Sequence, residues 1–212
     1  MKQEFWHERW AAQQIGFHNA EAHPMLVEFL PHFKLSMGDR VLVPLCGKTL
    51  DIHWLLAAGF RVVGVELVES AIVSLFDELG VTPIINKDGS LTRYSAEDID
   101  IFVGDIFALT AEQVGTVDFV YDRAALVALP KDMRARYSPQ VGVLSGYAPQ
   151  MLIVFEYEQE KMAGPPFAIF NEEIQSNYGG NYSIVELARK PVAGKLKGQI
   201  AAVEIVRALH VG

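Results

Sequence analysis

The stretch RVLVPLCGKTLDIHWLLAAGFRVVGVE, residues 40–66, decides the fold of this chain. Its two ends, 40–44 and 61–66, are short apolar runs rich in valine, a pattern typical of strands buried on both faces of a parallel sheet. Between them, residues 50–58 have the apolar spacing of a helix, which ends at Gly59. A strand, a helix and a second strand in so short a stretch predict a right-handed βαβ unit.

The flanking sequence extends this pattern in both directions. Upstream, residues 4–15 predict an amphipathic helix, and residues 25–33 predict a second helix or two turns broken at Pro31. Downstream we expect helices over 69–79, 131–144 and near 171–178, a small hairpin within 82–104, strands over 99–103, 117–121 and 151–157, and two antiparallel strands near 182–189 and 199–207. The chain is therefore predicted to be one α/β domain, residues 1–212, with a doubly wound, mostly parallel sheet, an antiparallel C-terminal edge and an N-terminal helical extension over residues 1–38.

Composition limits the classes of partner. The chain has 212 residues, half of them apolar, and a formal net charge of −8. This charge argues against a nucleic acid or an anionic membrane as partner, but it does not exclude a local basic pocket for an anionic small molecule. One cysteine, no secretion signal in residues 1–10 and no apolar run of membrane-spanning length favour a cytoplasmic protein, and at this size we expect a monomer.

The ligand site of an open α/β sheet lies outside the carboxyl ends of its strands. The turn PLCGK, residues 44–48, follows the first strand, and its Gly47 either lets the backbone approach a ligand or simply fits a tight turn. The turn lacks the three glycines of a dinucleotide-binding loop, which counts against a pyrophosphate. Glu66 ends the second strand, where a carboxylate either accepts hydrogen bonds from ribose hydroxyls or is merely solvated. Together they favour a nucleoside-bearing cofactor without a pyrophosphate, such as S-adenosylmethionine.

Two further strand ends carry candidate residues. After the strand at 99–103, Asp105 can contact an adenine amino group while Ile106 covers the ring, or Asp105 caps the following turn. At the end of the strand near 117–121, Asp122 and Arg123 face the predicted cleft, although a structural ion pair is the alternative for the arginine.

Other chemistries find little support in the sequence. Cys46 has no histidine partner in the sequence pattern and is interpreted as packing or backbone context. The six histidines show no spacing typical of metal ligands, so no metal site is expected. A GxSxG elbow, which would indicate a hydrolase, is also missing.

Several of these segments resemble one known family. The chain resembles the thiopurine S-methyltransferases, especially their bacterial forms, in the following segments and in this order: FWHERW and GFH (5–10 and 16–18), VLVPLCGKTLDIHWL (41–55), VVGVE (62–66), GDIF (104–107), VYDRAALVALP (120–130) and GPPF (164–167). Each segment alone is a weak signal, whereas PLCGK, DRAALVALP and GPPF in one order are highly specific. The match runs from about residue 5 to 170 and is weaker beyond.

The resemblance implies a class I methyltransferase fold whose N-terminal segment forms a lid over the cleft. It implies S-adenosylmethionine as cofactor and a small thiol as acceptor. By position, the family's cofactor-binding residues correspond to Trp10, Leu45, Glu66, Asp105, Ile106 and Arg123, and the family's aromatic at the acceptor pocket corresponds to Phe17. The adenine-contacting pair, which corresponds to Asp105 and Ile106, varies in the family.

This family implies methyl transfer to the sulfur of small aromatic or heterocyclic thiols. Arg123 would favour an anionic acceptor, Asp122 or a water would take a remaining proton, and Phe17 with Trp6 and Trp10 would cover a flat acceptor. Methylation of selenium or tellurium species is the alternative acceptor chemistry. Two other classes remain in comparison, a nucleotide-binding oxidoreductase, which the missing glycine motif disfavours, and a non-catalytic module that keeps the pocket.

Overall fold

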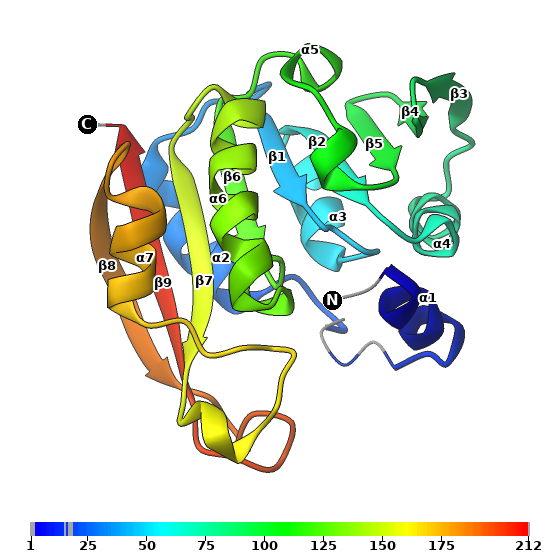
Figure 1. Ribbon diagram of the computed structural model, residues 1–212. Helices are drawn as coiled ribbons and strands as arrows, with labels where there is room; N and C mark the ends of the chain where they lie inside the picture. The colour runs from blue at the N-terminus through cyan, green and yellow to red at the C-terminus, as the bar shows by residue number, and fades with distance from the viewer. Residues whose placement is uncertain (1–2, 15, 17–18, 212) are drawn as a thin grey trace.

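A computed structural model describes residues 3–14, 16 and 19–211 of this chain. Its centre is a nine-stranded sheet in the order β3-β4-β5-β2-β1-β6-β7-β9-β8 (Figure 1). The five central strands run parallel to one another: β5 (Ile99–Val103), β2 (Arg61–Glu66), β1 (Arg40–Pro44), β6 (Phe119–Arg123) and β7 (Gln150–Glu156). The order reverses between β1 and β6, which is the doubly wound arrangement that the sequence predicts.

Antiparallel strands form both edges of the sheet. One edge is the hairpin of β3 (Ile84–Asp88) and β4 (Leu91–Ala96), with β4 antiparallel to β5. The other edge is the pair β8 (Tyr182–Pro191) and β9 (Val203–Val211), with β9 inserted beside β7. The sequence predicts the C-terminal antiparallel edge correctly. The antiparallel part is nevertheless larger than predicted, because the small hairpin also joins the sheet.

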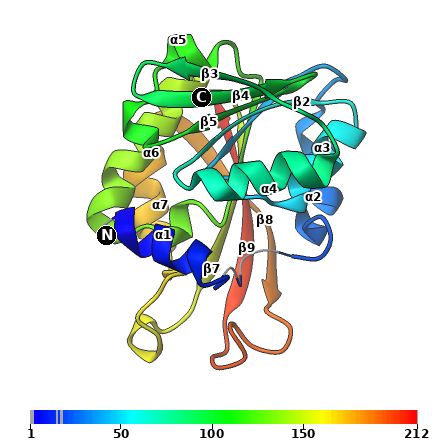
Figure 2. The ribbon, with the colours of Figure 1, turned by 90° about the vertical axis from the view of Figure 1, so that its right-hand side faces the viewer.

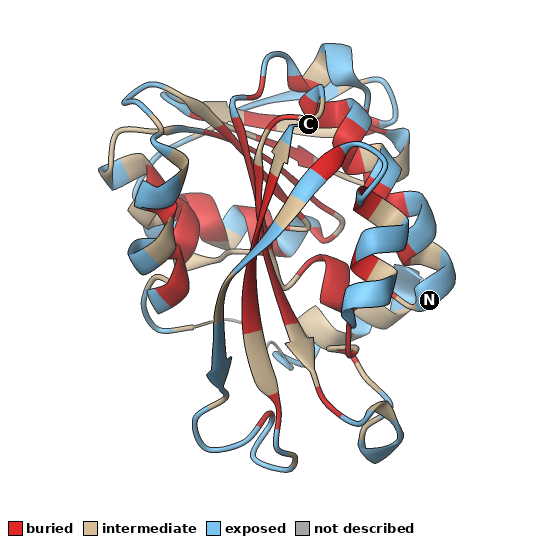
Figure 3. Cartoon of the chain, turned by 90° about the vertical axis from the view of Figure 1, so that its left-hand side faces the viewer, coloured by how far each residue is buried: buried red, intermediate tan, exposed pale blue. Residues whose placement is uncertain are grey.

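Helices cover both faces of the sheet, as Figure 2 shows. One layer contains α2 (Pro24–Phe29), α3 (Leu50–Ala57) and α4 (Glu69–Leu79), and the other contains α5 (Ala111–Val114), α6 (Lys131–Ser145) and α7 (Asn171–Tyr178). In β1, Val41 and Val43 pack into the core of the first layer and Leu42 into the core of the second, because successive side chains alternate across a strand. This explains why the strand is apolar from Val41 to Pro44 and why the central strands are buried in Figure 3.

The N-terminal segment forms smaller elements than the sequence predicts. The helix α1 (Gln3–Ala11) is shorter than the predicted 4–15 and buries none of its residues fully. It lies beyond the carboxyl ends of the central strands (Figure 1). The segment 25–33 divides into the α-helix α2 and the 3-10 turn η1 (Leu30–Phe33), which has Pro31 near its start. The observed segment thus combines the two alternatives, a short helix and a turn that contains Pro31. Three further 3-10 turns are η2 (Ile106–Ala108), η3 (Leu126–Ala128) and η4 (Gln159–Lys161).

The bounds of β6 differ from the sequence prediction in a way that affects the site. The strand begins at Phe119 and ends at Arg123, two residues later than the predicted 117–121. Asp122 and Arg123 are therefore its last two residues. Because neighbouring side chains in a strand point to opposite faces, the two residues cannot both face one cavity.

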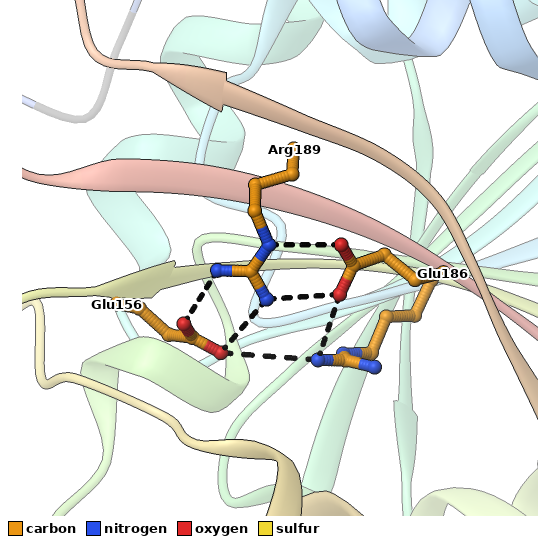
Figure 4. Close-up of polar contacts among 4 residues, drawn as sticks. Glu156, Glu186 and Arg189 are labelled. Atoms are coloured by element: carbon orange, nitrogen blue, oxygen red, sulfur yellow. Dashed lines mark hydrogen bonds and ion pairs between the residues drawn. The ribbon is translucent and has the colours of Figure 1, made fainter.

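A charged network joins the three strands of the C-terminal edge. Arg189 on β8 donates to Glu186 at 2.8 Å and 2.9 Å and to Glu156, at the end of β7, at 2.7 Å (Figure 4). Arg207 on β9, whose side chain is 5% exposed, lies 3.2 Å from Glu186. These contacts fix the β8–β9 hairpin to β7. No helix in the described part of the chain combines the length and apolarity that crossing a membrane requires.

Candidate active site

A first cavity opens at the carboxyl ends of the central strands. It is bounded by the turn after β1, the end of β2, the segment after β5, the end of β6 and the helix α1. Among its lining residues are six of those predicted from the sequence: Trp10, Leu45, Glu66, Asp105, Ile106 and Arg123. The structure thus brings together predicted residues that lie more than a hundred positions apart in the chain.

The turn after β1 bends sharply toward this cavity. Leu45 has a φ of +47° and Gly47 a φ of +52°, and only glycine adopts such angles without steric cost. Cys46 between them is buried, and its backbone N–H donates to the carbonyl of Val65 on the neighbouring strand at 3.1 Å. Burial, together with the charge of Glu66, raises the pKa of the Cys46 thiol well above its usual value, which makes it a poor nucleophile.

Glu66 holds the two strand ends together. Its Oε2 accepts from the backbone N–H of Gly47 at 2.8 Å, and its Oε1 accepts from that of Val68 at 2.9 Å. The residue is 6% exposed, and burial raises its pKa although these backbone hydrogen bonds partly offset the effect. Each carboxylate oxygen can accept a second hydrogen bond, so the side chain retains the capacity to bind two hydroxyls at the cavity wall. It does not point into bulk solvent.

Asp105 and Ile106 line the cavity at the end of β5. Asp105 Oδ1 accepts from the backbone N–H of Phe107 at 3.0 Å, which is the turn-capping contact that the sequence offers as the alternative. Its Oδ2 accepts from Gln3 Nε2 of α1 at 3.1 Å and so links the helix to the body of the protein. Ile106 is buried at 4% exposure. A role for Asp105 in binding adenine stays a prediction.

Arg123 lies where β6 reaches the cavity, beside two polar groups from other elements. Its Nη1 is 3.8 Å from Oδ2 of Asp51, the acidic residue in the first turn of α3. The same Oδ2 accepts from the Tyr121 hydroxyl at 3.0 Å. Arg123 is therefore held by a buried carboxylate while it lines the cavity, so it has both the structural contact and the cavity position that the sequence left as alternatives.

Asp122 faces the opposite side of the sheet. Its Oδ1 accepts from the backbone N–H of Leu126 at 3.1 Å, and its Oδ2 accepts from the Tyr137 hydroxyl at 2.7 Å. The residue is completely buried and does not line either cavity described here. The sequence suggests Asp122 as a proton acceptor for the reaction, but the alternation of side chains along β6 turns it away, and we do not assign that role to it.

The helix α1 supplies aromatic cover. Trp10 lines the first cavity, and Trp6 lines both the first and a second cavity. Phe17, which the family resemblance places at the acceptor pocket, lies outside the described residues.

The second cavity has a volume of about 550 Å³ and adjoins the first. Trp6, Arg123, Ala124 and Ala128 line both cavities, so the two meet at the end of β6. Ala124 has a φ of +61°, an unfavourable angle for a residue with a Cβ, and such strain is often found at functional sites. Apolar walls come from side chains that include Val127, Ile153, Phe155, Pro165 and Val192.

Charged residues of the second cavity come from distant parts of the chain. Arg9 belongs to α1, His23 precedes α2, Lys197 belongs to the β8–β9 turn and Glu204 to β9. Burial, with the positive charge of Arg9, lowers the pKa of Lys197, so two cations approach each other here. Among the described residues neither Arg9 nor Lys197 forms an ion pair with a carboxylate. The cavity is thus cationic within an acidic protein.

Sequence reasoning did not find these charged residues or Asp51. Asp51 follows the turn PLCGK and the helix cap Thr49, and that position was the only available signal. Arg9 is a charged residue in a predicted amphipathic helix, where a charged residue is usual and gives no signal. His23 and Glu204 lie 181 positions apart, so no local sequence pattern relates them. Within the described residues, no group of three or more His, Cys, Asp or Glu side chains is arranged to hold a metal ion.

Comparison with known proteins relates this chain to a family. The family model described as thiopurine S-methyltransferase matches residues 1–208. The chain is 54% identical over 207 residues to the thiopurine S-methyltransferase of Xanthobacter autotrophicus, covering 97% of each chain. It is 47% identical over 206 residues to that of Teredinibacter turnerae, covering 97% of this chain and 96% of the relative.

Solved structures with low sequence identity share the fold. The 1,6-didemethyltoxoflavin-N1-methyltransferase of Burkholderia thailandensis, solved with S-adenosylhomocysteine, superimposes with a TM-score of 0.66 at 15% identity, covering 99% of this chain and 87% of that one. An S-adenosylmethionine-dependent methyltransferase of Methanosarcina mazei gives a TM-score of 0.65 at 14% identity, covering 90% and 99%. The nine-stranded α/β architecture is therefore that of class I methyltransferases.

Proposed function

This chain belongs to the thiopurine S-methyltransferase family of S-adenosylmethionine-dependent enzymes, and from that premise we propose that it methylates the sulfur of small aromatic or heterocyclic thiols. The observation that carries this proposal is the pair of adjoining cavities, which meet at Arg123. One has the polar groups that a nucleoside requires, and the other is walled by apolar and aromatic side chains with cations.

The residues of the first cavity fit the cofactor. The free acceptor positions on Glu66 suit the two ribose hydroxyls, Ile106 offers an apolar surface to the adenine ring, and the bend at Leu45 exposes backbone for the methionine part. Trp10 covers the same cavity from α1. When bound, the cofactor supplies an activated methyl group on a positive sulfur.

The main task of this chain is then to align the acceptor for in-line attack. Proximity and orientation contribute about 7–11 kcal/mol to such reactions at their upper range. Trp6 and Arg123 line both cavities, and so they lie where the acceptor sulfur would meet the methyl group. The Arg123 guanidinium stabilises a thiolate there, and the apolar walls exclude water.

The cations of the second cavity support an anionic form of the acceptor. Arg9, Lys197 and Arg123 outnumber the carboxylate of Glu204 in a protein whose net charge is −8. A soft selenium or tellurium anion has the same features, so methylation of such species is the second candidate for this cavity.

The test is a parallel assay of methyl transfer from S-adenosylmethionine to 6-mercaptopurine, to thiophenol and to hydrogen selenide. We expect S-methylated product from both thiols, and Arg123→Ala should lower kcat by at least ~10-fold while changing the cofactor Kd far less. Turnover of selenide alone would favour the second candidate. Absence of product with all three acceptors would contradict both.

A further inference from the structure

Two cations lie close together in the second cavity without a counter-ion. Arg9 on α1 and Lys197 in the β8–β9 turn both line this cavity, and neither lines the first one. After burial, the charge of Arg9 is the further cause that lowers the pKa of Lys197, so the two groups are near enough to repel each other. Among the described residues that line the cavity, Glu204 is the one carboxylate, and its Oε1 lies 3.2 Å from Nε2 of His23. The described residues therefore do not neutralise Arg9 and Lys197.

Lys197 is positioned at the cavity by its neighbours. The preceding residue, Leu196, is buried and packs in a small apolar cluster that includes Tyr157 and Ala168. Nζ of Lys197 donates to the carbonyl oxygen of Pro165 at 2.5 Å, and Pro165 also lines the second cavity. An ammonium group has three N–H donors, so two of them remain for a ligand.

Arg9 is oriented by a contact within α1. Its guanidinium carbon lies 4.8 Å from the centre of the Phe5 ring, one helical turn earlier. This contact holds the guanidinium group but brings no net negative charge to it. The planar fork of N–H donors on an arginine matches the two oxygens of a carboxylate. Holding two cations together is unfavourable, whereas an anion that binds between them is attracted by both.

This pair of cations is separate from the place where the reaction occurs. Arg123 lines both cavities and marks their junction, whereas Arg9 and Lys197 line the second cavity alone. An acceptor whose sulfur lies at Arg123 extends into the second cavity. A different part of the same acceptor molecule then lies beside Arg9 and Lys197.

We propose that Arg9 and Lys197 bind a carboxylate of the acceptor, so that the preferred substrates are aryl thiols with a carboxylate remote from the sulfur. The inference rests on the proposed function, because it names the class of thiol. The carboxylate takes no part in methyl transfer and is bound equally before and during it. Its contacts therefore lower KM and leave kcat nearly unchanged. Arg123, which faces the reacting sulfur, affects kcat instead.

The experiment compares 4-mercaptobenzoate with 4-mercaptobenzamide, which has nearly the same shape and no charge. We expect the wild-type protein to have a kcat/KM about 10-fold higher for the benzoate, with the difference in KM, because hydrogen bonds to charged groups are the stronger ones. Lys197→Gln removes one charge and leaves an amide donor on the side chain. This variant and Arg9→Gln should each lower the benzoate-to-benzamide ratio of kcat/KM by about 3- to 5-fold.

Lys195→Gln is the matched control. Lys195 lies in the same turn, is exposed, and has a φ of +69° where Lys197 has +50°, but it lines neither cavity. Its substitution removes the same charge and should leave the ratio at the wild-type value. Arg9→Lys keeps a charge at position 9 and should retain most of the preference, which separates loss of the cation from a disturbance of α1.

A positional isomer tests the distance between the two groups of the acceptor. In 2-mercaptobenzoate the carboxylate is next to the sulfur and remains at the junction with Arg123. Lys197→Gln should therefore raise KM for 2-mercaptobenzoate less than it raises KM for 4-mercaptobenzoate. Equal increases for the two isomers would contradict a carboxylate site remote from the sulfur.

The outcomes separate this inference from the proposed function. A ratio that falls in Lys197→Gln and Arg9→Gln, and not in Lys195→Gln, supports the carboxylate site. A wild-type protein without preference for the benzoate, or an equal fall in Lys195→Gln, would overturn that site while leaving thiol methylation intact. A wild-type protein that methylates neither of these thiols nor 6-mercaptopurine would overturn the proposed function and the inference together.

Discussion

Glu66 carries two backbone hydrogen bonds and still faces the first cavity. Substitution by Gln keeps its size but removes the charge that strengthens any contact to the ribose hydroxyls. We expect Glu66→Gln to weaken binding of S-adenosylhomocysteine by about 10- to 100-fold, since hydrogen bonds to a charged group contribute about 1.5–3 kcal/mol. Titration calorimetry measures this. The exposed Glu172 on α7 offers the control Glu172→Gln, and equal affinities of the two variants would remove Glu66 from the cofactor site.

The burial of Asp122 predicts how the free energy of unfolding changes with pH. Burial raises its pKa to about 6 in the folded protein, against a value of about 3.9 in the unfolded chain. Between these values the folded state holds the proton and the unfolded state does not, so the free energy of unfolding falls as pH rises. The contribution is full below about pH 4 and is lost above pH 6, a change of about 3 kcal/mol.

The substitution Asp122→Asn removes this dependence and keeps partners for Tyr137 and Leu126. Relative to the wild type, the variant should therefore become more stable as pH rises from about 4 to 7. Urea unfolding across that range measures the difference, and parallel curves would contradict the prediction. Turnover should stay within about 2-fold, because the side chain does not line the cavities. A large loss of activity would restore the catalytic role that the sequence suggests.

At this scale, the sequence identifies residues that follow strands but not the direction of their side chains. The turn at 44–48, Glu66 and Arg123 could be predicted to lie at the cavity because strand ends meet at one edge of the sheet, whereas Leu45 was assigned from the family resemblance. The error for Asp122 comes from ending the strand at residue 121. Asp122 is in fact the penultimate residue of β6, so its side chain alternates with that of Arg123 and lies on the opposite face. His23 and Glu204 could not be paired from the sequence, because only the folded sheet brings β9 next to the start of α2.

Helix α1 covers the first cavity without being part of the core, since none of its residues is fully buried. Trp10→Ala should therefore weaken cofactor binding by about 10-fold while changing the free energy of unfolding of the free protein by less than about 0.5 kcal/mol. Calorimetry and urea unfolding give the two quantities. Glu8→Ala on the exposed side of the same helix should change neither, and a destabilised Trp10→Ala would mean that α1 supports the fold itself.

The β8–β9 hairpin depends on its charged network. Arg207 is almost completely buried, and Glu186 is its nearest carboxylate at 3.2 Å. Glu186→Gln should lower the free energy of unfolding by about 1–2 kcal/mol, because it leaves a buried guanidinium less compensated. The exposed pair of Glu158 and Lys161 provides the control, and Glu158→Gln should cost less than about 0.5 kcal/mol. Similar unfolding curves for the two variants would show that the network contributes no more than an ordinary surface pair.

Among the elements, those with strong patterns were predicted well. The bounds of β1, β2, α4 and β5 agree with the sequence because runs of β-branched residues mark the strands and a capping glycine marks the end of the helix. The end of α1 was not predicted, because its pattern continues past Ala11 without a burial constraint to fix it. The antiparallel pairing of β4 with β5 joins a polar hairpin to the sheet, and polar strands carry little periodic signal.

For the whole molecule, the sequence shows the class of fold and the edge at which the site forms, because βαβ units leave few other arrangements. It cannot show the second cavity. That cavity is assembled from α1, the start of α2, the end of β6 and the β8–β9 hairpin, whose mutual positions depend on tertiary contacts such as the Arg189 network. The net charge of −8 describes the whole chain and gives no indication that the lining of this cavity is cationic.

The wall that the two cavities share has a thermodynamic consequence. Trp6 and Arg123 belong to both, so a molecule that fills one cavity restricts the same side chains that the other occupant must find in place. We therefore expect occupancy of the two sites to be cooperative. By thermodynamic linkage, the factor by which the first ligand raises the affinity for the second equals the factor by which the second raises the affinity for the first. Bound S-adenosylhomocysteine would accordingly slow the release of the methylated product. Dissociation of either product would lower the affinity for the other.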